Sequence, residues 1–249
     1  MAIRRTTIQR LREMKTARDL KVDAATAAII QSWVEAWDAL LPTWQLAVDS
    51  LLIEGAGAWP SRKAVFENQR LVKAMELTLQ QLEAAANLAA IEISVPLDPM
   101  LQEALAFQQQ VAASQLPRNY ATVGISFDRI DARAIAAIVE RSRKIVERRL
   151  LSVPGEVLQA IMTEVVRGVA IGVNPRDVAR RMVRRVEERF NLGLNRAMVI
   201  ARTEMLDAYR ASTQLFEMAN ADVVQEWAWL ATLRSEERRV GKECRSRWS

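Results

Sequence analysis

Apolar side chains recur at every third or fourth position over most of the chain, which is the period of an amphipathic α-helix. Ala, Leu, Glu, Arg and Gln dominate the composition, and only eight glycines and seven prolines interrupt the 249 residues. The pattern therefore predicts a mainly α-helical, multi-helix fold. The expected helices cover residues 8–20, 23–41 (followed by a second segment that ends at 54), 61–88, 98–113, 128–151, 157–169, 175–190 and 195–220.

Proline, glycine and asparagine mark the expected helix ends. Pro42 is expected to end the helix that covers 23–41. Residues 91–96 are expected to form a linker, and residues 191–193 (Asn-Leu-Gly) to form a turn. One start signal is strong, because an asparagine can cap the helix, a proline suits its first position and an aspartate complements its dipole. These helix-start residues are Asn174, Pro175 and Asp177.

A different period appears at 223–233, where side chains alternate as they do in a β-strand, with Trp227 and Trp229 on one side. A single strand needs a partner, and no other segment shows the same alternation. We therefore expect the sheet partners of this strand to lie outside the sequence. Residues 114–126 show little periodicity, so we predict an N-terminal helical region over 1–122 and a second region over 123–233.

The last sixteen residues, 234–249, read like the forward translation of a common short-read sequencing adapter. They show no hydrophobic period, so we expect them to be an artefact joined to a gene fragment; the alternative is a genuine basic arm. They hold six basic and three acidic residues, which is +3 of the formal net charge of +5, so residues 1–233 carry +2. The basic balance is then a weak argument for nucleic acid or an anionic membrane as partner.

Two residue types that carry much of enzyme chemistry are missing from residues 1–233. The chain has no histidine, and its one cysteine, Cys244, lies in the last sixteen residues. Disulfides, most zinc sites and histidine-based acid–base catalysis are therefore excluded from 1–233. No apolar run approaches the roughly 20 residues that a membrane span needs. We predict no catalytic residues, metal, cofactor or small-molecule substrate, and no membrane contact.

Three pieces of sequence occur in a characteristic order: Gly-Val-Asn-Pro at 172–175, Ala-Arg-Thr-Glu at 201–204 and Trp-Ala-Trp-Leu-Ala-Thr-Leu at 227–233. In this order they resemble the phage head morphogenesis family, the minor head proteins typified by protein F of phage Mu. The resemblance covers roughly residues 123–233. The family continues with an Asp-x-x-Thr-Cys-x-x-Cys stretch and a later His-Gly, at the point where the adapter-like residues begin here.

The resemblance implies a structural, non-catalytic protein of a tailed phage or prophage. Such a protein acts in head morphogenesis near the portal vertex, in DNA packaging or delivery. The implied partners are the portal protein and other head proteins, with packaged DNA as a further candidate. The implied location is the virion head, after synthesis in the host cytoplasm. The N-terminal helical region lies outside the resemblance, and we expect it to face the partners.

Two sets of polar residues are candidate sites. Polar side chains of the family motif are expected to form a partly buried network that orients the last helix, with catalysis as the less favoured alternative. The residues of this motif are Arg202, Thr203, Glu204, Asp207 and Tyr209. An arginine stripe on helix 175–190 is expected to be a solvated face, with contact to phosphates or to an acidic protein as the alternative. Its members are Arg181, Arg184, Arg185 and Arg189.

Four tryptophans of the N-terminal region are expected to pack in the helical core, with a partner interface as the alternative; these are Trp33, Trp37, Trp44 and Trp59. Two rival functions stay open on the sequence alone. One is a nucleic-acid-binding module that uses the arginine stripe of residues 176–189. The other is a fragment of an enzyme or toxin whose catalytic domain lies beyond the chain.

Overall fold

A computed structural model describes residues 6–54, 61–115, 130–170 and 175–221. As predicted, the protein is mainly α-helical. The helices are α1 (Thr7–Glu54), α2 (Arg62–Glu67), α3 (Gln69–Ser94), α4 (Leu97–Gln115), α5 (Ala132–Leu151), α6 (Val153–Ala170) and α7 (Pro175–Ala219).

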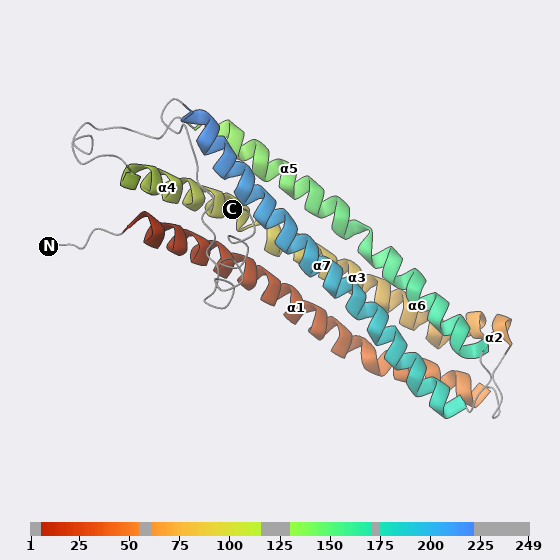
Figure 1. The fold of residues 1–249 in the computed structure, drawn as a ribbon. Coiled ribbons are helices and arrows are strands. Elements are labelled where there is room, and N and C mark those ends of the chain that lie inside the picture. Colours follow the sequence, from red (N-terminus) through yellow and green to blue (C-terminus); the bar gives the residue numbers. More distant parts are fainter. Residues whose placement is uncertain (1–5, 55–60, 116–129, 171–174, 222–249) are drawn as a thin grey trace, which may run out of the picture.

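Two long unbroken helices, α1 and α7, run antiparallel along the length of an elongated bundle (Figure 1). They contain 48 and 45 residues, which corresponds to about 70 Å at the rise of an α-helix. Trp33 of α1 donates a hydrogen bond from its indole nitrogen to the backbone oxygen of Phe190 at 3.2 Å. Asp23 lies 3.5 Å from Arg202, nearer the C-terminal end of α7. These two contacts fix the antiparallel register of the two long helices.

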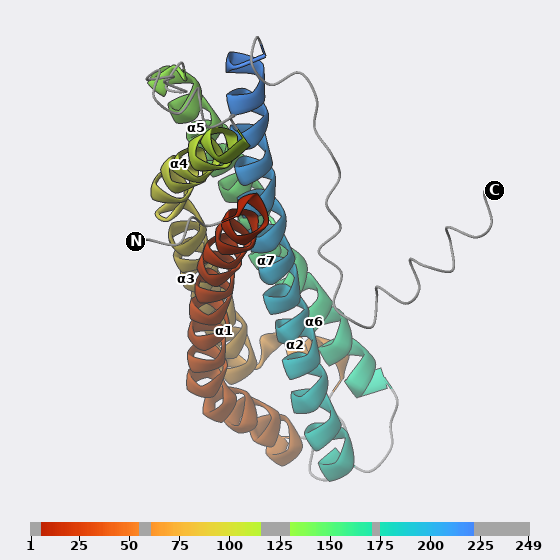
Figure 2. The ribbon, with the colours of Figure 1, turned by 60° about the vertical axis from the view of Figure 1, so that its left-hand side comes forward.

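Each long helix is accompanied by two shorter helices that follow one another end to end (Figures 1 and 2). Trp44 of α1 donates to the Thr78 hydroxyl of α3 at 2.9 Å, and Thr7, at the start of α1, bonds Ser114 of α4 at 2.8 Å. In the same way α5 and then α6 run antiparallel to α7. The architecture is therefore a bundle of four rods, two continuous and two interrupted.

Pro42 does not end a helix, contrary to the prediction, because α1 continues through it to Glu54. A proline in a helix interior costs about 3 kcal/mol. However, Trp44, Val48 and Leu51 are all buried beyond it, and burying each large apolar side chain contributes about 1.5–3 kcal/mol. Packing of the following turns outweighs the lost backbone hydrogen bond, and Figure 2 shows α1 bending toward its C-terminal end.

The predicted turn at 191–193 is also wrong, since α7 passes through it without a break. A Cβ atom on Gly193 would lie 3.0 Å from a ring carbon of Trp33, 3.0 Å from Val157 and 3.3 Å from Val153. The missing side chain lets α1, α6 and α7 approach one another closely at this point. The glycine is thus required by helix packing rather than by a turn.

Several other helix bounds differ from the prediction. The expected helix over 61–88 is divided at Asn68, whose side chain accepts a hydrogen bond from the backbone of Leu71 and caps α3. The expected linker at 91–96 is wrong for its first four residues, because α3 extends to Ser94. Asp131 caps α5, so this helix begins at Ala132 rather than at 128. The predicted starts of α4 and of α7 near Pro99 and Pro175 are confirmed within two residues.

Side chains from both sides of residues 122–123 form a single buried cluster. Trp33, Trp37 and Trp44 belong to it, which confirms the core prediction for these three tryptophans. Both Trp33 and Trp37 pack their rings against Phe190 of α7, with centroids 5.8 and 5.3 Å away. The fourth tryptophan, Trp59, lies outside the described residues. So do the predicted boundary at 122–123, the predicted strand with Trp227 and Trp229, and the residues 234–249.

Candidate functional site

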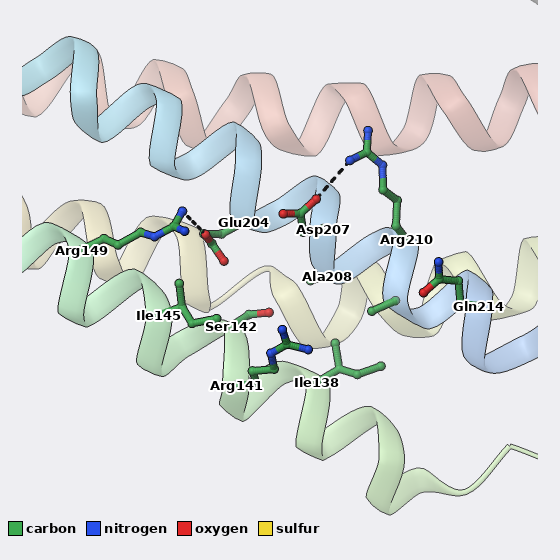
Figure 3. A pocket seen from close by; sticks show the side chains of 11 residues that line it. Ile138, Arg141, Ser142, Ile145, Arg149, Glu204, Asp207, Ala208, Arg210 and Gln214 are labelled. Atoms are coloured by element: carbon green, nitrogen blue, oxygen red, sulfur yellow. Dashed lines mark hydrogen bonds and ion pairs between the residues drawn. The ribbon is translucent and has the colours of Figure 1, made fainter.

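Two of the candidate motif residues, Glu204 and Asp207, line a cleft between α5 and α7 (Figure 3). The cleft has a volume of about 390 Å³, and both partly buried isoleucines and charged side chains line it. It is lined by Ile138, Arg141, Ser142, Ile145 and Arg149 of α5 and by Glu204, Asp207, Ala208, Arg210, Ala211 and Gln214 of α7.

Glu204 is the buried anion of the cleft, with only 6% of its side chain exposed. Its Oε1 accepts a charge-assisted hydrogen bond from Arg149 of α5 at 2.5 Å. Burying a carboxylate is costly unless a cation pairs with it, and removing one member of such a pair is strongly destabilising. The pair therefore fixes α5 against α7, and half of the Arg149 side chain remains exposed to solvent.

The other residues of the motif do not join Glu204 in one network. Arg202 is turned toward α1, where it lies 3.5 Å from Asp23 in an exposed pair. Asp207 pairs with Arg210 of the same helix at 3.1 Å, and Thr203 is exposed. The predicted partly buried network is thus divided among different neighbours, because Arg202 and Glu204, two residues apart, lie on nearly opposite faces of α7 and meet different helices.

Tyr209 is buried where α7 packs against α1 and α4. The guanidinium of Arg18 lies 5.6 Å from the centre of its ring, which is a cation–π distance. Burial raises the pKa of the Tyr209 phenol to about 12. Its hydroxyl oxygen has no hydrogen-bond partner among the described residues. This side chain contributes to packing and does not line the cleft of Figure 3.

The predicted arginine stripe on α7 is largely occupied by internal ion pairs. Glu164 of α6 is buried and accepts a hydrogen bond from Arg189 at 2.8 Å, while its second oxygen lies 3.5 Å from Arg185. The hydrogen bond from Arg189 holds the pKa of Glu164 below its ordinary value of 4.5, against the opposing effect of burial. Arg184 pairs with Glu188 at 3.5 Å on the surface, and Arg181 is exposed. Two of the four arginines therefore bind α6 instead of facing solvent together.

The helix-start residues are placed only in part. Pro175 is the first residue of α7, as predicted, and Asp177 lies in the first turn of that helix. Asn174 is outside the described residues.

Sequence reasoning missed the arginines of α5. Four of them are exposed and form no ion pair with any residue that the structure describes; these are Arg133, Arg141, Arg143 and Arg148. Their abundance in this segment was visible in the sequence. Their lack of partners was not, because pairing depends on which helix faces them.

At the cleft, Glu204 is bonded to Arg149 of α5 and Asp207 to Arg210 of its own helix, and the first of these pairs joins α5 to α7. Arg141, which also lines the cleft, forms no ion pair with a described residue. Within residues 6–54, 61–115, 130–170 and 175–221, no group of three His, Cys, Asp or Glu side chains is placed to hold a metal ion. In the same ranges, no helix combines the length and apolar character needed to cross a membrane. Comparisons with protein-family models, curated proteins and solved structures found no match to this chain.

Proposed function

We propose that this protein is a phage minor head protein, a structural and non-catalytic component that acts in head morphogenesis near the portal. The resemblance of residues 123–233 to that family is the basis of the proposal. One observation supports a structural role for the motif. Its most characteristic acidic residue, Glu204, is buried and engaged by Arg149, so it stabilises the contact between two helices. A group committed in this way is poorly suited to proton transfer, which needs a carboxylate within reach of a substrate.

The proposal includes the strand that the alternation at 223–233 predicts, with Trp227 and Trp229 on one side. The family's cysteine-containing stretch would follow this strand. Sequencing the source locus with long reads through codon 233 tests this part. We expect the frame to continue into Asp-x-x-Thr-Cys-x-x-Cys beside a gene for a portal protein. Genomic reads that reproduce codons 234–249 among unrelated genes would contradict it.

The proposed partners are the portal protein and other head proteins, which would be contacted along the sides of the elongated bundle. Its two unbroken helices give faces of about 70 Å. The direct test is co-expression with the portal protein encoded at the same locus, followed by size-exclusion chromatography with light scattering. We expect a complex of defined stoichiometry. If this chain does not co-migrate with the portal protein, the proposal is wrong.

A further inference from the structure

The helix α5 has a strong excess of positive charge. Between Ala132 and Leu151 it carries six basic and two acidic residues, a net charge of +4. The two acidic residues do little to neutralise the others. Glu140 pairs with Lys144 at 3.1 Å, and Glu147 forms no ion pair among the described residues.

The ion pairs divide the basic residues of α5 into two groups. Arg149 is bonded to Glu204, and Lys144 to Glu140. The remaining four arginines, Arg133, Arg141, Arg143 and Arg148, have no carboxylate within ion-pair distance in the described parts of the chain. On α7, by contrast, each arginine from residue 184 onward is paired with a carboxylate; these are Arg184, Arg185, Arg189, Arg196, Arg202 and Arg210.

Three of the unpaired arginines lie on one side of α5. From Arg133 to Arg141, Lys144 and Arg148 the steps are eight, three and four residues, which keeps these side chains within one helix face. We call the face formed by these four residues the α5 basic stripe. It extends over about 22 Å of helix. Arg141 also lines the cleft toward α7, where Figure 3 shows it projecting from the same side of α5 as Arg149.

We propose that the α5 basic stripe binds the sugar–phosphate backbone of nucleic acid. A guanidinium group donates two parallel hydrogen bonds to a phosphate, and its charge is held permanently. Because Arg133, Arg141 and Arg148 have no internal carboxylate partner among the described residues, binding them to phosphate breaks no ion pair. Release of counterions from the phosphates then supplies the binding free energy, independently of base sequence.

The composition of the stripe favours nucleic acid over an acidic protein surface. Stable protein interfaces are built around a core from which charged residues are depleted and in which aromatic and apolar side chains are enriched. On α5 the only large apolar side chain that is exposed is Leu151, which lies beyond the stripe at the end of the helix. Phosphate contacts need no apolar centre. The binding would go beyond the proposed structural role, which does not require it.

The test uses the full chain, so that the basic residues of 234–249 are present in every sample. A triple variant, Arg133→Gln, Arg141→Gln and Arg148→Gln, is compared with wild type for binding to a short mixed-sequence DNA duplex by fluorescence anisotropy. The control variant is Arg184→Gln, Arg202→Gln and Arg210→Gln, which removes the same charge from exposed but paired positions on α7. Circular dichroism verifies that both variants are folded.

We expect the α5 variant to bind DNA at least about tenfold more weakly at low salt. Each lost phosphate contact changes the slope of log K against log salt by about 0.9, so three lost contacts make the slope shallower by about 3 between roughly 50 and 200 mM salt. The control variant should change the slope by less than about 1. Equal losses in the two variants, an unchanged α5 variant, or a wild type that does not bind at low salt would each overturn the proposal.

Two further measurements distinguish nucleic-acid binding from binding of an acidic protein and from binding of the portal protein. Polyglutamate is tested in place of DNA. If it binds as tightly as DNA and responds equally to the α5 variant, then the stripe recognises acidic protein and the proposal is overturned. Portal binding by the α5 variant is measured as well. We expect it to be retained, because the stripe is separate from the proposed structural role, so failure of DNA binding and failure of portal binding are distinguishable.

Discussion

The arginines of α5 and those of α7 look alike in the sequence but differ in what surrounds them. On α7, Arg185 and Arg189 are turned toward the buried Glu164 of α6. On α5, Arg141 and Arg148 form no ion pair with any described residue. A basic stripe is therefore available to a partner only where carboxylates of the same protein do not already pair with its arginines. The number of arginines in a segment does not show this.

The largest loss of stability is expected at the contact between α6 and α7. Arg185 and Arg189 of α7 pair with Glu164 of α6 across this contact. Gly193→Leu inserts a side chain where a Cβ alone would lie 3.0 Å from Trp33 and Val157. We expect a loss of about 3 kcal/mol or more in the free energy of unfolding, measured with urea. Gly155→Leu is the matched control, because nothing lies within 4 Å of the corresponding Cβ. Equal stability of the two variants would contradict the packing role of Gly193.

Two adjacent arginines of α5 allow the stability contribution of a paired arginine to be compared with that of an unpaired one. Arg149→Met leaves the carboxylate of Glu204 buried without its cation, and we expect a loss of about 2–3 kcal/mol of stability. Arg148→Met removes an exposed and unpaired charge, and we expect a change within about 0.5 kcal/mol. Thermal unfolding of both variants under identical conditions measures the difference. A similar Tm for the two would show that the Arg149–Glu204 pair does not hold the helices together.

The ion pairs that Arg185 and Arg189 of α7 form with Glu164 should make the stability of the protein depend on pH in the acid range. The pKa of Glu164 is lowered in the folded protein, chiefly by the hydrogen bond from Arg189. Its stabilising contribution is therefore complete above the ordinary pKa of 4.5 and is lost as the pH falls through the lowered folded value. Glu164→Gln should be less stable than wild type by on the order of 1 kcal/mol at neutral pH. The gap should narrow in acid, and urea unfolding at several pH values detects this; a gap that stays constant contradicts the assignment.

The smallest change in stability is expected at Tyr209, a buried side chain whose pKa is shifted chiefly by burial and not by an ion pair. Its phenol should titrate near pH 12 in the folded protein, as followed by phenolate absorbance. Because the folded pKa is raised, the associated stability is present below the ordinary value of 10 and is lost as the pH rises above it. Tyr209→Phe should remove this titration and change stability by no more than about 1 kcal/mol, since the hydroxyl has no partner among the described residues. A titration near 10 would contradict the burial of the ring.

Hydrophobic periodicity was sufficient to predict the helical class and the core position of Trp33 and Trp44. Local signals for helix ends were less reliable. Pro42 and Gly193 both carry the sequence signature of a break, and in both places tertiary packing maintains the helix. The bond between Arg149 and Glu204 could not be predicted from the sequence. It joins residues 55 positions apart, and their proximity depends on how α5 packs against α7.

The interruptions of the two broken rods have a mechanical consequence. The break between α3 and α4 follows Ser94, and the break between α5 and α6 follows Leu151. Ile91, near the end of α3, and Leu151, at the end of α5, line one cleft. The other two rods, α1 and α7, are helical without a break past these points. The bundle should therefore bend most easily near its middle, where two of its four rods are interrupted. Bending there would change the angle between the two ends of the bundle and leave the packing within each half intact.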